Sequence, residues 1–252
     1  MLDLYIICLG ILLGSFLYTT ALRLEKRESL LYRSQCDSCE SSIDIIGLIP
    51  ILGYILRMGK CNKCGSKINI SYPLIEIVNG VLILLIYSKT GLSLDFIHKL
   101  VFFEILFLIG IIDFRTHLIF PHPIFLGLIA NLIWILFINP TTMMDSVIGL
   151  LVGAGVFHWV SYIYQSLRKR VGLGEGDATL LGLIGFVLGW NVLFSIVFWA
   201  AFIGVVMGAL LLLYRKRSFS SEIAFGPWLV ISAFLGWMYP EWFQWIPSFS
   251  LF

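Results

Sequence analysis

Long apolar stretches separated by short polar segments make up most of the chain. They run at about 4–22, 73–88, 97–113, 119–138, 144–165, 177–190, 192–214 and 224–240. About 20 apolar residues in a helix cross the hydrocarbon core of a bilayer, so these stretches predict transmembrane helices. Trp190 and Asn191 alone separate the sixth stretch from the seventh. We therefore expect about eight spans, or seven if these two stretches form a re-entrant segment.

The composition supports an all-α, polytopic transmembrane helix bundle. Hydrophobic residues make up 59% of the chain and charged residues only 13%, whereas about a quarter of the residues in a soluble protein are charged. The net charge of +2 is too small to indicate nucleic acid as a partner. We expect membrane lipids to surround the helices.

The positive charges predict the orientation of the chain. Asp3 precedes the first apolar stretch and Arg23 follows it, which is the reverse of a cleaved signal peptide, so this stretch should remain as an anchor. If the segment after it is cytoplasmic, 15 of the 17 Lys and Arg residues lie in cytoplasmic loops. Cytoplasmic loops of membrane proteins are enriched in Lys and Arg, so this orientation is the expected one. It places the N-terminus outside and, with eight spans, the C-terminus outside as well. The clusters 168–170 and 215–217 would contact anionic headgroups.

One polar insert interrupts the apolar pattern. Residues 24–72 hold most of the polar sequence and are too long for an ordinary connection between helices. We expect three parts: a first transmembrane helix at 1–23, a small cytoplasmic domain at 24–72, and a transmembrane helix bundle at 73–252 that carries any catalytic residues.

Four cysteines give this insert a candidate metal site. Cys36 and Cys39 form one Cys-x2-Cys pair, and Cys61 and Cys64 form a second after 21 intervening residues, which resembles zinc-ribbon spacing. Four thiolates complete a tetrahedral Zn²⁺ shell with no open position, so the metal would be structural. Two disulfides are the alternative, although the reducing cytosol disfavours them. Cys8, in the first apolar stretch, is best explained as a small buried residue.

Two aspartates form the candidate catalytic pair. Asp113 ends one apolar stretch and Asp177 begins another, and two membrane crossings between them bring both to the same side. Charges beside apolar helices are costly to keep. In an aspartyl dyad one carboxylate activates water while the other, protonated, polarises the scissile carbonyl. Alternatively, Asp177 caps a helix and Asp113 pairs with Arg115.

Glycines are expected to assist at two places. Gly174 and Gly176 precede Asp177 and would permit a close approach of the backbone. Gly149, Gly153 and Gly155 suit close packing between helices.

Glu76, just inside the second apolar stretch, has two open interpretations. It either has a functional role, or it snorkels to water or pairs with a basic residue of a loop.

Segments along almost the whole chain resemble the bacterial type IV prepilin peptidase family, membrane aspartic proteases with a Gly-x-Gly-Asp active-site motif. The similar segments, in order, are Gly14-Ser15-Phe16-Leu17 with Arg23, the two Cys-x2-Cys pairs, Ile49-Pro50-Ile51-Leu52 through Gly59-Lys60-Cys61, Ser71-Tyr72-Pro73-Leu74-Ile75-Glu76, Ile112-Asp113, Gly174-Glu175-Gly176-Asp177 and Phe225-Gly226-Pro227. Each match alone is weak, but the ordered set is specific.

The resemblance implies an activity and its substrates. Members cleave the basic leader from type IV prepilin or pseudopilin precursors at the edge of the bacterial cytoplasmic membrane. Many then N-methylate the new N-terminus with S-adenosylmethionine as the methyl donor. On this resemblance Asp113 and Asp177 are catalytic, the active site faces the cytoplasm, and the four cysteines bind Zn²⁺.

Three positions depart from the family pattern. Tyr18 stands where Asn is common, Thr179 where Lys is common, and the segment Ile119-Phe120-Pro121-His122 differs from the usual sequence after the first aspartate. These changes leave the acid pair intact and bear on substrate fit and methylation.

Two other classes of protein compete with a peptidase. In a non-catalytic membrane assembly factor, the zinc insert would dock a cytosolic partner and the acids would only cap helices. A transporter would place its acids near the bilayer midplane in broken helices, whereas here they stand at the ends of apolar stretches.

Overall fold

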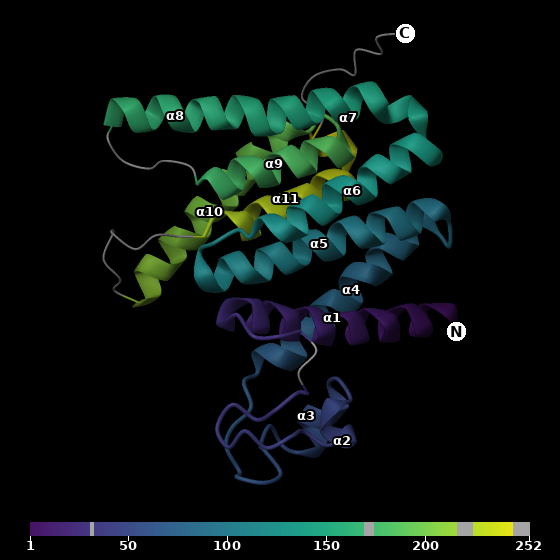
Figure 1. The fold of residues 1–252 in the computed structure, drawn as a ribbon, viewed down its shortest axis with the longest axis vertical. Helices are drawn as coiled ribbons and strands as arrows, with labels where there is room; N and C mark the ends of the chain where they lie inside the picture. Colours follow the sequence, from purple (N-terminus) through teal and green to yellow (C-terminus); the bar gives the residue numbers. More distant parts are fainter. Residues whose placement is uncertain (31–32, 169–173, 216–223, 244–252) are drawn as a thin grey trace. The chain divides into compact units, whose positions relative to one another are not determined.

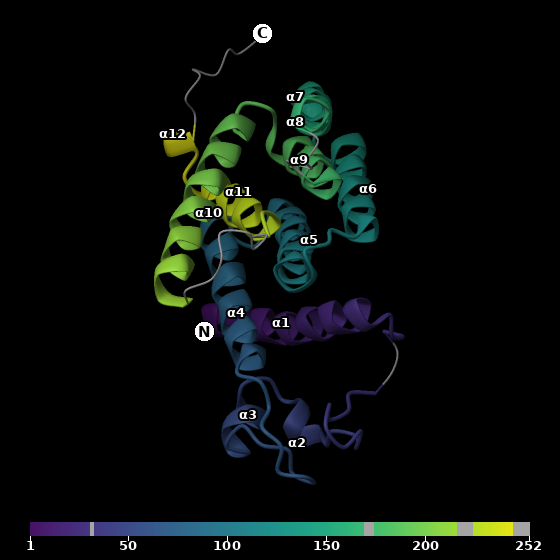
Figure 2. The same cartoon turned by 90° about the vertical axis from the view of Figure 1, so that its left-hand side faces the viewer.

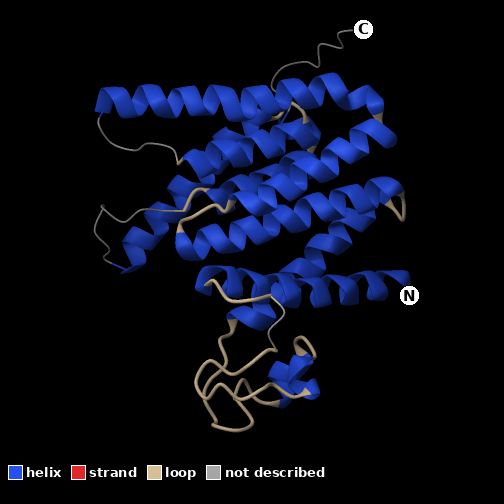
Figure 3. Ribbon diagram, viewed as in Figure 1, coloured by secondary structure: helices blue, strands red, loops and turns tan. Residues whose placement is uncertain are grey.

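The computed structural model describes residues 1–30, 33–168, 174–215 and 224–243. The parts of the predicted basic clusters at 169–170 and 216–217 lie outside these residues. Within the described ranges the chain is helical, and Figure 3 shows helices joined by loops without a strand. The predicted all-α class is confirmed.

Each predicted apolar stretch forms a helix. The helices are α1 (Leu2–Lys26), α4 (Ser71–Thr90), α5 (Leu94–Thr116), α6 (Pro121–Phe137), the continuous rod of α7 (Met143–Leu150), a π-helical segment (Leu151–Val156) and α8 (Phe157–Arg168), then α9 (Glu175–Leu188), α10 (Leu193–Arg215) and α11 (Gly226–Met238), as Figure 1 shows. Short helices α2 (Ile45–Leu48) and α3 (Leu52–Leu56) lie in the polar insert, and α12 (Pro240–Phe243) follows α11.

The chain is a multi-pass membrane protein. Four of its described helices are long and apolar enough to cross a bilayer: Leu2–Lys26, Ser71–Thr90, Pro140–Leu167 and Leu193–Leu210. Two more, Pro121–Phe137 and Gly226–Met238, are apolar but shorter. Large apolar side chains such as Phe16, Phe125 and Phe198 are exposed on these helices, as lipid-facing residues should be. Cys8 is also exposed on α1, so the prediction that it is buried is wrong.

The break between the sixth and seventh apolar stretches is real, because α9 ends at Leu188 and α10 begins at Leu193. Since α9 has 14 residues, it is only about 21 Å long, less than the roughly 30 Å hydrocarbon core. The total of about eight spans stays a prediction.

The chain divides into two compact units, Met1–Leu100 and Val101–Phe252. In the first unit α1 packs closely on α4, because a Cβ on Gly10 would lie 2.7 Å from the Cα of Gly80. The Asn79 side-chain amide of α4 donates a hydrogen bond to the Gly10 carbonyl at 3.0 Å. Small residues and buried amides are typical of helix pairs in membranes.

In the second unit α9 lies against α6 and α7 (Figure 2). Its side chains Leu180, Leu181, Leu183 and Ile184 are fully buried. The predicted packing role of the glycines is confirmed for Gly149 and Gly153, because a Cβ there would lie 2.0 Å and 2.3 Å from carbonyl oxygens of α9. It is wrong for Gly155, which faces open space. The packed core thus fixes the helix that carries Asp177.

Candidate active site and metal centre

Asp113 lies in the last turn of α5 and is almost completely buried, with 4% of the residue exposed. The helix ends three residues later, and the backbone N–H of His117, the next residue, donates to the Asp113 carbonyl at 2.9 Å with φ of His117 at 54°. The Asp113 side chain contacts another helix. Its Oδ2 accepts the backbone N–H of Gly226, the first residue of α11, at 2.9 Å.

Asp177 lies in the first turn of α9. Its Oδ2 accepts the backbone N–H of Gly174, the residue before the helix, at 3.3 Å. An acid at the third helical position that bonds back to the N-cap is half of a capping box. Asp177 is therefore not the N-cap residue itself, which is Gly174, but its side chain bonds back to that residue from the first turn and fixes the carboxyl at the helix end.

Both aspartates lie in the second unit, and the helix ends that carry them are close together. The charge of Asp113 acts on Asp177 electrostatically. The start of α9 also approaches the segment after α5, since a Cβ on Gly176 would lie 2.7 Å from the Cβ of Ile119. Gly174 is similarly confined, because a Cβ there would lie 3.2 Å from Asp177 Oδ2. Both glycines therefore allow the close backbone approach that the sequence indicated.

Gly226 is the residue whose role the sequence did not reveal. The sequence suggested an ion pair with Arg115 as the alternative role of Asp113. In the structure, Asp113 Oδ2 accepts a hydrogen bond from the backbone N–H of Gly226, 113 residues away. The available signal was Phe225-Gly226-Pro227 immediately before an apolar stretch. Proline soon after the start of a helix is common, so this motif predicts where a helix begins. It does not predict which carboxyl contacts that helix N-terminus.

The four paired cysteines form a candidate zinc centre in the first unit. The sulfur atoms of Cys36, Cys39, Cys61 and Cys64 all lie within 4.8 Å of one another, and Cys36 and Cys64 are separated by 3.9 Å. Tetrahedral zinc with Zn–S bonds of about 2.3 Å requires sulfurs about 3.8 Å apart. All four thiols are free, so the donor set fits a closed, structural zinc site.

Two matching backbone turns present these thiols. The Cys36 N–H donates to the Ser41 carbonyl at 3.0 Å, and the Cys61 N–H donates to the Ser66 carbonyl at 2.8 Å. A hydrogen bond from Ser66, followed by bonds from the backbone of Ser38 and Cys39, lowers the pKa of the Cys36 thiol to about 6. A thiolate, the form that binds metal, is thereby favoured.

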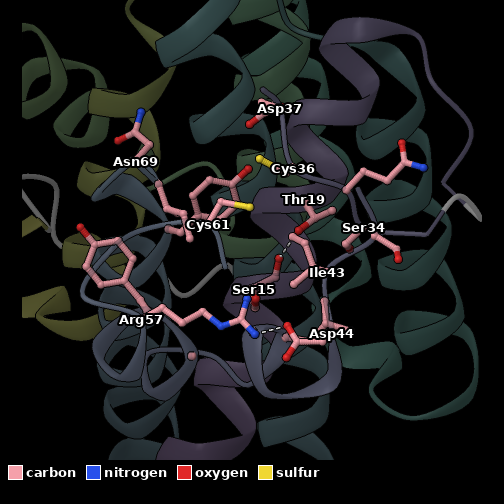
Figure 4. A pocket seen from close by; sticks show the side chains of 18 of the residues that line it. Ser15, Thr19, Ser34, Cys36, Asp37, Ile43, Asp44, Arg57, Cys61 and Asn69 are labelled. Atoms are coloured by element: carbon pink, nitrogen blue, oxygen red, sulfur yellow. Dashed lines mark hydrogen bonds and ion pairs between the residues drawn. The ribbon is translucent and has the colours of Figure 1, made fainter. Parts of the chain in front are cut away.

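A cavity of about 560 Å³ adjoins the metal centre in the first unit (Figure 4). Ser15 and Thr19 of α1 line it together with Cys36 and Cys61. The Arg57 guanidinium forms an ion pair with Asp44 at its wall. Its volume is in the range of small-ligand sites.

Glu76 of α4 also lines this cavity and is 4% exposed. Its Oε2 accepts the backbone N–H of Ile51 at 2.7 Å, and Ser15 provides a side-chain hydrogen bond. Ile51 has φ 60° and ψ −55°, with the Leu52 N–H bonded to the Pro50 carbonyl, which is a strained γ-turn for a β-branched residue. Glu76 therefore holds a strained loop in place over the cavity.

Two sequence profiles match consecutive parts of the chain. The bacterial peptidase A24 N-terminal domain matches residues 8–90, and the type IV leader peptidase family matches residues 100–209. The first match holds the cysteines and Glu76, and the second holds both aspartates.

Curated relatives match nearly the whole chain. A Bacillus subtilis (strain 168) protein named prepilin leader peptidase/N-methyltransferase is 32% identical over 92% of this chain and 92% of its own length. Relatives of the same name are 28% identical in Pseudomonas putida, over 93% of this chain and 88% of the relative, and 32% identical in Neisseria gonorrhoeae, over 81% and 69%. No solved structure gives a significant match.

Proposed function

We propose that this chain, which belongs to the type IV leader peptidase family, is an aspartic endopeptidase of the bacterial cytoplasmic membrane with Asp113 and Asp177 as its catalytic residues. Its substrates are type IV prepilin or pseudopilin precursors, from which it removes the basic leader. The observation that supports this proposal is the close approach of the helix ends that carry the two acids, since a Cβ on Gly176, next to Asp177, would lie 2.7 Å from the Cβ of Ile119, just after α5.

The chemistry follows from two neighbouring acids in a partly buried site. Two carboxylates close together do not both ionise cheaply, so the pair shares one proton. The ionised member activates water, and the protonated member polarises the carbonyl of the scissile bond. Helix ends are a suitable place for such a pair, because water has access there while apolar helix faces hold the hydrophobic segment of the substrate.

The orientation that fits this chemistry has the active site facing the cytoplasm. Fifteen of the 17 basic residues then lie on the cytoplasmic side, as the positive-inside rule requires. The basic leader would remain in the cytosol and the pilin helix in the bilayer, which places the scissile bond at the membrane edge.

The test is cleavage of a prepilin-like precursor by membranes that carry the wild type, Asp113→Asn or Asp177→Asn. Both variants should fail to produce the shortened product. Asp145→Asn is the matched control, because Asp145 is an exposed acid in the first turn of α7 and its loss should leave cleavage unchanged. Undiminished cleavage by either active-site variant would favour the non-catalytic assembly factor instead.

N-methylation of the new N-terminus is a second proposed activity. The relatives carry N-methyltransferase in their names, and the cavity of the first unit has both acidic and basic walls, which suit a ligand with amino-acid and nucleoside parts. S-adenosylmethionine would supply the methyl group when bound there. Mass spectrometry of the processed pilin checks this: one added methyl group on the new N-terminus is expected, and an unmodified N-terminus contradicts it.

A further inference from the structure

The two aspartates have unequal surroundings. Asp113 is buried and accepts a backbone N–H at 2.9 Å from another helix. Asp177 is half-buried and accepts its backbone N–H at 3.3 Å from the residue that precedes its own helix. A hydrogen bond donated to a carboxylate stabilises the charged form, and the shorter bond belongs to Asp113.

The donor to Asp113 stands at the N-terminus of a 13-residue helix. Gly226 is the first residue of α11, and Pro227, which follows, has no N–H to donate. The first N–H groups of a helix have no partner within it and carry the positive end of the helix dipole. The start of α11 is therefore electrostatically suited to a negative carboxylate at Asp113.

Glycine at position 226 is required by space. A Cβ there would lie 2.6 Å from Asp113 Oδ2 and 3.0 Å from its Cγ. Gly226 does not adopt a positive φ, so the backbone conformation alone would accept another residue. Any side chain would push the carboxyl away from the N–H that now binds it.

We propose that Gly226 is a positioning residue that holds Asp113 as the ionised member of the pair, so that Asp177 carries the shared proton. This inference rests on the proposed peptidase function. His117 also acts electrostatically on Asp113, and Asp113 acts on Asp177, but the hydrogen bond from Gly226 fixes the direction of the Asp113 carboxyl as well as its charge.

The assignment gives each carboxyl a defined step. Water attacks the scissile carbonyl carbon and gives one proton to Asp113, while Asp177 gives its proton to the carbonyl oxygen. When the carbon–nitrogen bond breaks, the leaving amine takes the proton from Asp113, and a hydroxyl of the tetrahedral intermediate returns one to Asp177. The pair ends with one proton, as it began.

Gly226→Ala tests the proposal, with Gly110→Ala as the control. Gly110 lies one turn before Asp113 on α5 and also faces α11, but a Cβ there would lie 3.5 Å from Val230, an ordinary contact. Both changes add one methyl group between the same two helices. A hydrogen bond to a charged group is worth about ten- to a hundredfold in an equilibrium constant, so kcat should fall by that factor in Gly226→Ala with KM within about twofold. Gly110→Ala should retain both parameters.

A second variant removes the N–H and adds no atom. Replacing Gly226 by glycolic acid turns its amide into an ester, which leaves the shape of the site nearly unchanged. The same fall in kcat at a melting temperature close to that of Gly110→Ala supports the proposal. A wild-type kcat in the ester variant, or a rise in KM with kcat unchanged, overturns it.

Asp113→Asn and Asp177→Asn in the same assay separate this proposal from the function on which it rests. If both are inactive while the ester variant cleaves normally, only the role of Gly226 is rejected. If either aspartate variant cleaves normally, the peptidase assignment fails as well.

Discussion

The cysteine-rich insert and the bundle around α9 hold their functional side chains in place by opposite means. In the insert, apolar residues such as Ile45, Leu52 and Ile55 are exposed, and four thiols gather at one point. Around α9, successive apolar side chains are fully buried, and glycines bring neighbouring backbones together. A region with too little core to fold alone needs a metal, whereas a region with a packed core can position acids through helix packing.

Of the changes that distinguish the two regions, removal of the metal should have the largest effect on folding. Purified protein should contain about one Zn²⁺ per chain, and Cys39→Ser with Cys61→Ser should abolish it, because structural zinc supplies on the order of 10 kcal/mol of folding free energy to a small domain. Metal analysis with hydrogen exchange over residues 33–67 measures both losses. Cys8→Ser, in α1, is the control and should keep the metal. A metal-free protein with four free thiols would contradict the assignment.

The next largest effect on stability is expected in the bundle around α9, where a methyl group is added at the closest glycine contact. Gly149→Ala places a Cβ 2.0 Å from the Gly185 carbonyl oxygen, and overpacking of this kind costs about 3 kcal/mol or slightly more. Thermal unfolding in detergent should show a clear fall in stability together with lost cleavage. Gly155→Ala, a matched change into open space, should behave like the wild type. Equal stability of the two variants would show that α7 and α9 are not packed as described.

Each unit has a buried asparagine that joins two helices, so matched substitutions allow a direct comparison of the units. Asn131 of α6 donates to the Phe186 carbonyl of α9 at 2.7 Å, and Asn79 plays the corresponding part between α4 and α1. Hydrogen bonds between membrane helices are worth about 1 kcal/mol, so Asn131→Ala and Asn79→Ala should each lower stability by about that amount. Only Asn131→Ala should also slow cleavage, because α9 carries Asp177. An equal loss of cleavage in both variants would contradict the claim that packing around α9, in the second unit, positions the catalytic acids.

The smallest effect concerns the two cysteine turns. Glu40 and Gly65 occupy equivalent positions, with φ of 54° and 72°, and each donates its N–H to the first cysteine of its pair. A side chain costs about 1 kcal/mol in this conformation. Glu40→Gly should therefore stabilise the insert by about 1 kcal/mol and Gly65→Ala should destabilise it by a similar amount, as measured by competition with a zinc chelator. Changes of the same sign would show that the turns are not equivalent.

The sequence predicted the features that depend on local pattern. Apolar length located the helices, including the break before α10, and cysteine spacing located the sulfur cluster. It did not predict that Asp113 would bind Gly226, because that contact joins helix ends far apart in the chain and depends on tertiary packing. It also missed the strained turn at Ile51, since a β-branched residue gives no local signal for a positive φ. The partner of Glu76 was thus a backbone N–H rather than a basic residue.

The central claim is that Asp113 and Asp177 act as one catalytic unit, and the rates of prepilin cleavage by the two single Asn variants and the double variant test it most directly. Each single change should lower the rate by on the order of a thousandfold or more, and the double variant should be no slower than the slower single one, because members of one catalytic unit are not additive. A double variant whose loss equals the product of the two single losses, or a single variant that cleaves at the wild-type rate, would contradict the account.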